Sequence, residues 1–178
     1  MYTLIRLMNM GEEYIMNMTK EQKMVELGAI GEEMVADLFR LRGHKVVLSE
    51  NKYDSEKDMM IDGQTCEVKT QMPYFLRKLF SVKPDQHFKC INADKLIWVE
   101  APSKHNDYRV DIYEAPARGK RVFIKYKAKK NGVYVSRYGM SFDDTKILAS
   151  FEGSIEAIRM INLLTNSDMT VVNKLNVH

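Results

Sequence analysis

The stretch Asp58–Thr70, with the sequence DMMIDGQTCEVKT, decides how the centre of this chain folds. Two runs with strand character, residues 58–61 and 64–70, flank the dipeptide Asp62-Gly63. An Asp-Gly pair is a strong signal for a two-residue hairpin turn, because both turn positions need a positive φ angle. The stretch therefore predicts two antiparallel strands joined by a tight turn.

The predicted hairpin brings charged side chains together. A two-residue turn pairs Met59 with Cys66 and Asp58 with Glu67, and directly opposed residues share a face with Cβ atoms about 5 Å apart. Lys69 lies two positions beyond Glu67 and points to the same face. Opposed like charges destabilise a sheet, and a divalent cation offsets them. Asp58 and Glu67 are therefore candidate ligands for Mg²⁺, with Mn²⁺ as a substitute, and Lys69 is a candidate catalytic lysine.

A long amphipathic helix is predicted upstream, over residues 20–42. Thr19 and Gln22 have the spacing of a capping box, and Gly43 occupies the usual C-terminal position. Apolar residues recur at helical spacing and form the stripe expected to face the core: Leu27, Ile30, Met34, Val35, Leu38 and Phe39.

Glu32 lies at the border of this apolar stripe, whereas Glu33 points to solvent. Of the two acids, Glu32 is therefore the one expected to face the sheet. Gly28 and Gly31 lie on the same side of the helix and would permit a close approach to its neighbour. These features predict that Glu32 lies near the hairpin acids.

The remaining predicted elements mix strands and helices along the chain. Strand patterns cover 44–49, 95–100 and 108–114; helical patterns cover 85–92 and 153–164; a second hairpin, 121–128 with 133–138, surrounds Asn131-Gly132. This order is typical of an α/β (or α+β) fold with a mixed central β-sheet flanked by helices, a basic C-terminal β-hairpin and a C-terminal helix. We expect an N-terminal arm at 1–18, one domain over 19–165 and a C-terminal tail at 166–178.

The arrangement of Asp58, Glu67 and Lys69 resembles the D…ExK signature of the PD-(D/E)XK nuclease superfamily. The segment from Gly31 resembles the glutamate-bearing helix that often precedes that signature, and residues 86–99 resemble the helix and core strand that follow it. The resemblance covers roughly residues 25–100, and Lys57 stands where the family name has a proline.

This resemblance implies a restriction-endonuclease-like core and a role for each matching residue. Asp58 and Glu67 would hold Mg²⁺ together with the backbone carbonyl of Val68, and Lys69 would be the catalytic lysine. Glu32 would be an accessory acid, and Gln86 would contact substrate or water.

Positive charge is concentrated between residues 115 and 142. This segment holds eight Lys and Arg residues and no acid, whereas the whole chain has a net charge of only +3, so the rest is net negative. Such a local concentration favours a surface that faces a polyanion. The residues predicted to contact DNA phosphates are Arg121, Lys125, Lys127, Lys129, Lys130 and Arg137. The alternative is a solvated sheet edge whose lysines prevent aggregation.

Composition excludes several other classes. Cys66 and Cys90 are far apart without CxxC spacing, and the apolar strand pattern around Cys66 predicts a buried, reduced thiol there. The four histidines lack the spacing of zinc ligands. No apolar run reaches the roughly 18 residues of a membrane span, and the first residues do not have the pattern of a secretory signal. We expect an intracellular, cytoplasmic protein with no membrane partner.

The function expected from these features is a metal-dependent DNA endonuclease that hydrolyses phosphodiester bonds with Mg²⁺-activated water. Within enzymes the alternatives are a Holliday-junction resolvase and a restriction-type endonuclease, both working as homodimers. From other classes, the alternatives are a nucleic-acid-binding module that does not cut, and a subunit that depends on a protein partner bound through its C-terminal third.

Overall fold

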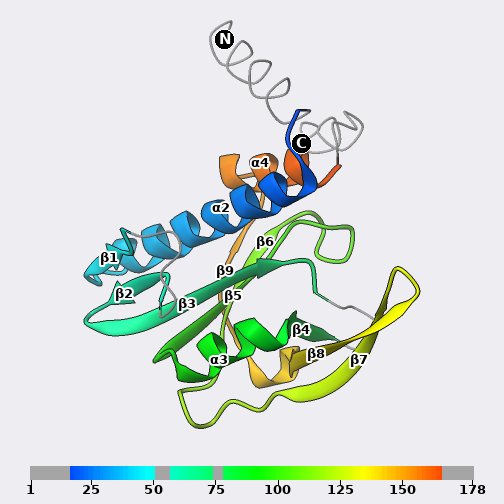
Figure 1. Cartoon of the computed structure of the whole chain (residues 1–178). Helices are drawn as coiled ribbons and strands as arrows, with labels where there is room; N and C mark the ends of the chain where they lie inside the picture. The colour runs from blue at the N-terminus through cyan, green and yellow to red at the C-terminus, as the bar shows by residue number, and fades with distance from the viewer. Residues whose placement is uncertain (1–16, 51–56, 74–77, 166–178) are drawn as a thin grey trace, which may run out of the picture.

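The computed structural model describes residues 17–50, 57–73 and 78–165, which form three layers (Figure 1). A six-stranded sheet lies in the middle, with two helices on one face and a shorter helix plus a three-stranded sheet on the other. The helices are α2 (Lys20–Leu41), α3 (Pro84–Asn92) and α4 (Ile155–Thr165). The predicted tail and all but the last two residues of the predicted arm lie outside the described residues.

The central sheet has the order β1-β2-β3-β5-β6-β9. It is mixed, because β3 and β5 run parallel while the other neighbouring pairs are antiparallel. Its strands are β1 (Val46–Leu48), β2 (Met59–Ile61), β3 (Gln64–Gln71), β5 (Lys95–Glu100), β6 (Val110–Glu114) and β9 (Lys146–Phe151). The predicted mixed α/β architecture, a central sheet flanked by helices, is confirmed at this level.

Helix α2 starts and stops where its sequence signals predicted. The Thr19 N–H donates to Gln22 Oε1 at 2.7 Å, and the Gln22 N–H donates to Thr19 Oγ1 at 3.2 Å, which completes the capping box. Gly43 follows the helix with a φ of +85°, a conformation that glycine adopts without strain. Local chemistry alone therefore sets the ends of this helix.

The predicted hairpin is also confirmed. Asp62 and Gly63 have φ angles of 49° and 80°, as a type I′ turn requires, and Met59 pairs with Cys66. Regular pairing ends at Met59, and the N–H of Asp58 donates to the Cys66 carbonyl at 3.0 Å. Asp58 thus lies directly beyond the last regular pair of the hairpin, and the predicted direct pairing of Asp58 with Glu67 is wrong.

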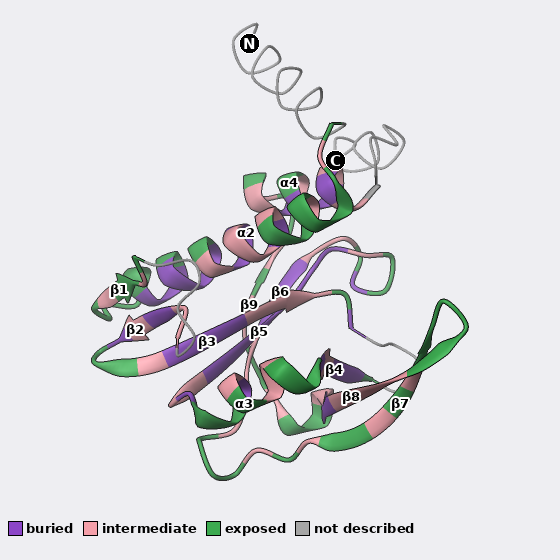
Figure 2. Ribbon diagram, viewed as in Figure 1, coloured by how far each residue is buried: buried purple, intermediate pink, exposed green. Residues whose placement is uncertain are grey.

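Two apolar cores separate the layers (Figure 2). The larger core lies between α2, α4 and the face of the central sheet that carries Cys66 and Val68. The smaller core lies on the other face, where Trp98 stacks on Phe80 with ring centroids 4.9 Å apart. Since side chains alternate along a strand, Glu67 and Lys69 point toward the smaller core.

The second sheet was not predicted as a separate layer. It has the order β4-β8-β7, with the strands β4 (Leu79–Val82), β7 (Ile124–Lys130) and β8 (Val133–Ser141). The predicted Asn131-Gly132 hairpin joins β7 to β8, but β4 and β9 have no counterpart in the sequence-based prediction. Within the described residues, no helix combines the length and the apolar character that crossing a membrane requires.

Candidate active site

Asp58 is anchored to the strand that carries the other candidate residues. Its Oδ2 accepts a hydrogen bond of 2.7 Å from the main-chain N–H of Val68, the residue between Glu67 and Lys69. In an extended strand the N–H and C=O of one residue point to the same side. The Val68 carbonyl therefore also points to the side of Asp58, beyond the end of β2.

Glu67 and Lys69 form a buried ion pair. The Lys69 Nζ contacts Glu67 Oε1, and the side chains are 20% and 0% exposed respectively. Two residues apart on one strand, they share a face, so the geometry of β3 alone brings them together. The three residues predicted from the D…ExK pattern, Asp58, Glu67 and Lys69, thus lie in one place.

The second carboxylate oxygen of Glu67 has no hydrogen-bond partner within the described part of the chain, although it is fully buried. A buried oxygen without a donor costs free energy, commonly about 1–3 kcal/mol. A cation, a proton or a water molecule at Oε2 would remove that cost. Glu67 Oε2 is therefore the atom of this site that is best suited to bind a cation.

The ionisation of the pair follows from its surroundings. Burial raises the pKa of Glu67, Lys69 opposes this shift, and the negative charge of Asp58 adds to it. For Lys69, burial would lower the pKa, but the charges of Glu67 and Asp58 outweigh it and raise the pKa above its ordinary value. Lys69 is therefore a protonated, cationic group at neutral pH.

Helix α3 covers this site from the side of the smaller core. Cys90 is buried there, and burial raises its pKa to about 12, so it is an unreactive thiol. Lys89 lowers the pKa of Glu67 through its positive charge, a contribution that the sequence-based reasoning did not assign. Gln86 lies half-buried one turn earlier on α3, and its predicted substrate contact stays a prediction.

Helix α2 packs against the opposite face of β3. Gly31 approaches so closely that a Cβ there would lie 1.9 Å from Thr70 Oγ1, whereas a Cβ at Gly28 would meet nothing within 4 Å. The predicted close approach is therefore confirmed for Gly31 and wrong for Gly28. Glu32 follows directly and is half-buried.

Across the three described segments, no three His, Cys, Asp or Glu side chains lie close enough together to hold a metal ion. Glu32 therefore does not complete a three-acid group with Asp58 and Glu67. The candidate ligand set is consequently two carboxylates and the Val68 carbonyl, and the accessory role of Glu32 stays a prediction. Two carboxylates with water and phosphate oxygens are a normal environment for Mg²⁺.

Arg121 does not belong with the predicted DNA contacts. Its guanidinium donates to main-chain carbonyls at the end of α3 and beside it, with bonds of 2.6 Å to Ala93, 2.7 Å to Cys90 and 2.8 Å to Pro116. A further bond of 2.9 Å reaches the carbonyl of Asp94. These carbonyls occupy the donors that a phosphate would need, so the predicted role of Arg121 is corrected to a structural one.

The other predicted DNA contacts lie on the β7–β8 hairpin and divide between its faces. The register pairs Tyr126 with Arg137 and Lys129 with Tyr134, and directly opposed residues share a face. One face therefore carries Lys125, Lys127 and Lys129, and the other carries Tyr126, Ala128, Lys130 and Arg137. All four lysines are exposed, and Arg137 is half-buried.

A second pair of acids was not found from the sequence. Glu100 and Asp111 are directly opposed on β5 and β6, and both are almost fully buried. Burial raises the pKa of Glu100, the Tyr113 hydroxyl opposes this through a 3.0 Å hydrogen bond, and Asp111 adds to it. The strand patterns contained both acids, but their pairing depends on a register that no local turn defines.

Comparison of the chain with protein-family models, with curated proteins and with solved structures gives no match.

Proposed function

We propose that this protein is a magnesium-dependent DNA endonuclease with Asp58, Glu67 and Lys69 at its active site. The observation that carries the proposal is the buried carboxylate of Glu67, with one oxygen lacking a donor, next to Val68, whose N–H holds the carboxylate of Asp58. A cationic lysine contacts the other Glu67 oxygen. These groups are the ones that hydrolysis of a phosphodiester by metal-activated water needs.

Each residue has a separate role in this proposal. Asp58, Glu67 and the Val68 carbonyl would hold Mg²⁺, which would lower the pKa of a bound water and polarise a phosphoryl oxygen. Lys69, whose pKa is raised by the charges of Glu67 and Asp58, would donate a hydrogen bond and place a positive charge toward the phosphate. The Val68 N–H orients Asp58.

The order of elements supports membership of the PD-(D/E)XK nuclease superfamily. The resemblance implies a glutamate-bearing helix, then the D…ExK hairpin, then a further helix and a core strand. Helix α2, the β2–β3 hairpin, α3 and β5 follow in that order, and β5 pairs parallel with β3. Beyond the mixed α/β architecture, this order of elements favours a restriction-endonuclease-like core, which we include in the proposal.

Cleavage of supercoiled plasmid tests the proposal. We expect nicked and linear products with Mg²⁺ or Mn²⁺ and none with EDTA. Glu67→Gln should reduce the rate at least about 100-fold, because it removes a charged ligand without changing the shape of the side chain. Glu33→Gln is the matched control, since Glu33 is an exposed acid paired with Arg159 at 3.5 Å. Equal rates for the wild type and Glu67→Gln would refute the assignment.

Full burial of Glu67 favours one alternative, a module that binds nucleic acid without cutting it. In that case Lys69 neutralises a structural acid and no metal enters. Titration of the protein with Mg²⁺ or Mn²⁺ by calorimetry separates the two. Binding that is lost in Glu67→Gln supports the enzyme; no binding, together with intact affinity for DNA, supports the module.

A further inference from the structure

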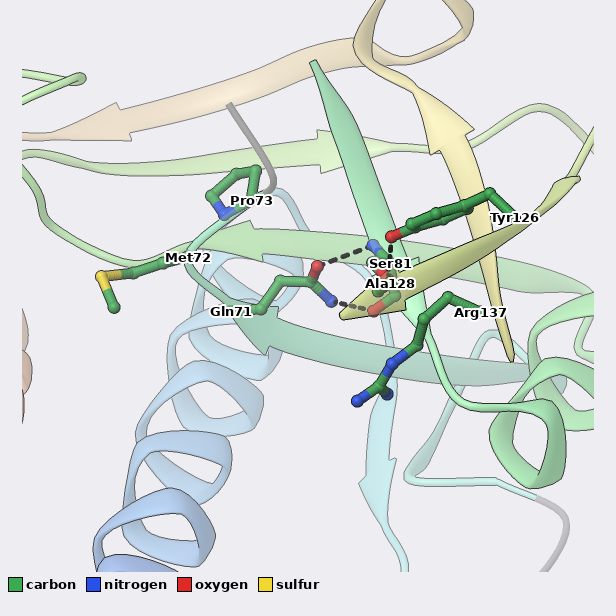
Figure 3. A pocket seen from close by; sticks show the side chains of 7 residues that line it. All are labelled: Gln71, Met72, Pro73, Ser81, Tyr126, Ala128 and Arg137. Carbon is green, nitrogen blue, oxygen red and sulfur yellow. Dashed lines mark hydrogen bonds between the residues drawn. The ribbon is translucent and has the colours of Figure 1, made fainter. Parts of the chain in front are cut away.

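An open hollow of about 350 Å³ lies beside the proposed active site, between the end of β3 and the β7–β8 hairpin (Figure 3). Its walls come from the central sheet on one side and from the second sheet on the other. They include Gln71, Pro73, Ser81, Tyr126, Ala128 and Arg137. The volume is at the lower end of the range typical for small-ligand sites.

Hydrogen bonds hold the inner walls in place. The Gln71 amide accepts from the Ser81 N–H at 2.7 Å and donates to the Ser81 carbonyl at 2.9 Å, as a neighbouring strand would. The Tyr126 hydroxyl donates to Ser81 Oγ at 2.7 Å, and its ring passes over Gly139, where a Cβ would lie 3.1 Å from the ring. The hollow is therefore preformed, and these polar groups already have partners.

Arg137 is different from the other residues of the hollow. In the part of the chain that the structure describes, its guanidinium forms no ion pair and no hydrogen bond. Figure 3 shows the side chain beside Gln71, with no dashed line to any of the residues drawn. A guanidinium presents a planar set of donors that matches a phosphate group. Arg137 thus offers an unused anion site at the edge of the hollow.

The hollow lies close to the residues of the proposed active site. Gln71 lies two positions after Lys69 on β3 and on the same face, which places their Cα atoms about 7 Å apart. The three hairpin lysines at 125, 127 and 129 occupy the opposite face of β7 and do not border the hollow. Among the predicted phosphate contacts, Arg137 is therefore the one that faces both the hollow and the end of β3.

We propose that this hollow receives a single unpaired nucleotide of the DNA substrate next to the scissile phosphate, with the Arg137 guanidinium on its phosphate. The inference rests on the proposed endonuclease function and names the substrate class: DNA with an unpaired strand near the cut. A paired base cannot enter a hollow of this size together with its partner strand. An unpaired nucleotide can, and its base would pack against Pro73 and Tyr126.

Binding of three DNAs of related sequence tests the proposal: a single strand, a duplex with a single-stranded flap, and a continuous duplex. Affinities are measured by fluorescence anisotropy with EDTA present, so that nothing is cut. Arg137→Ala should weaken binding of the single strand and the flap by about tenfold. Lys127→Ala is the matched control, because it removes one charge from the opposite face of the same hairpin and should weaken all three DNAs by one common factor.

Ala128→Leu is the second variant, because it fills the hollow and leaves the charge unchanged. It should also weaken single-strand and flap binding selectively. Thermal unfolding checks that each variant is folded, and Arg137→Lys should fall between the wild type and Arg137→Ala. Equal losses on all three DNAs, or unchanged affinities, would overturn the proposal.

Cleavage of the flap DNA by the same wild-type protein with Mg²⁺ separates this inference from the proposed endonuclease function, because the flap DNA contains the unpaired strand that the inference requires. If the wild type cleaves and the variants of the hollow lose affinity equally for all three DNAs, only the proposed role of the hollow is refuted. Selective binding without any cleavage removes the endonuclease function, and with it the position next to a scissile phosphate.

Discussion

Asp58 Oδ2 accepts a 2.7 Å hydrogen bond from the main-chain N–H of Val68, at the point where regular pairing of β2 with β3 has ended. A side chain thus takes the place of the next main-chain acceptor. The bond holds Asp58 beside the buried Glu67, which a loose strand end would not do. Two acids that would otherwise separate are kept together, and this proximity is the basis of the proposed metal site.

Removing Lys69 should expose how strongly the site depends on charge compensation. Lys69→Met leaves Glu67 buried without its partner, so we expect a loss of about 3–5 kcal/mol in the free energy of unfolding. The double variant Glu67→Gln/Lys69→Met should lose much less, because both charges disappear together. Urea denaturation of the single and double variants measures the difference. Additive losses would show that the pair is not coupled.

Gly31 should be intolerant of a methyl group. An alanine in a helix is normally favoured over glycine by about 1 kcal/mol, but a Cβ at Gly31 would lie 1.9 Å from Thr70 Oγ1. We expect Gly31→Ala to lose about 1–3 kcal/mol in the free energy of unfolding, since the side chain of Thr70 is stiff. Gly28→Ala on the same helix should be neutral or stabilising. Thr70→Ala should restore much of the loss, and a stable Gly31→Ala single variant would contradict the close packing.

Arg121 should affect stability rather than DNA binding. Arg121→Ala removes several donors from the main-chain carbonyls around the end of α3, so we expect a loss of about 2–3 kcal/mol in the free energy of unfolding. Lys127→Ala should leave stability within about 0.5 kcal/mol of the wild type. For DNA binding we expect the opposite: Lys127→Ala should reduce the slope of log affinity against log salt by about 1, whereas Arg121→Ala should leave this slope unchanged. A reduced slope for folded Arg121→Ala would return it to the contact set.

Stability should depend on pH through Glu100. Its pKa is raised by burial, with Asp111 adding to the shift, so the folded protein holds this proton more tightly than the unfolded chain does. The stabilising contribution is fully present below the unfolded pKa of 4.5 and is lost as the pH rises through the folded pKa. Glu100→Gln does not ionise, so its stability relative to the wild type should rise with pH over that window. Thermal melts from pH 4 to 8 measure this, and a difference independent of pH would contradict it.

Elements with local signals were predicted correctly. The capping box at Thr19, the Gly43 stop and the Asp62-Gly63 turn each depend on residues within a few positions of one another. The register of the hairpin from Met59 to Cys66 follows from the turn type alone, whereas the position of Asp58 beside Glu67 also needs its hydrogen bond to the Val68 N–H.

Elements that depend on distant partners were missed. Strand β4 is four residues long and becomes a strand by pairing with β8, about 60 positions later in the chain. The contact of Glu100 with Asp111 needs the β5–β6 register, and Arg121 needs carbonyls about 30 residues earlier in the chain. Neither short strands nor main-chain acceptors leave a periodic pattern in the sequence.

The sequence by itself determined the chemistry of the centre: a two-residue turn that brings Asp58, just before β2, back toward Glu67 on β3, with a lysine two positions beyond Glu67. Only the tertiary structure decided how deeply these residues are buried and which groups surround them. It buried Glu67 under α3, diverted Arg121 to the main chain and left the guanidinium of Arg137 facing a hollow. The physical reason is range, because turn geometry acts over a few residues, whereas burial and hydrogen-bond partners depend on layers that meet only after the whole chain has folded.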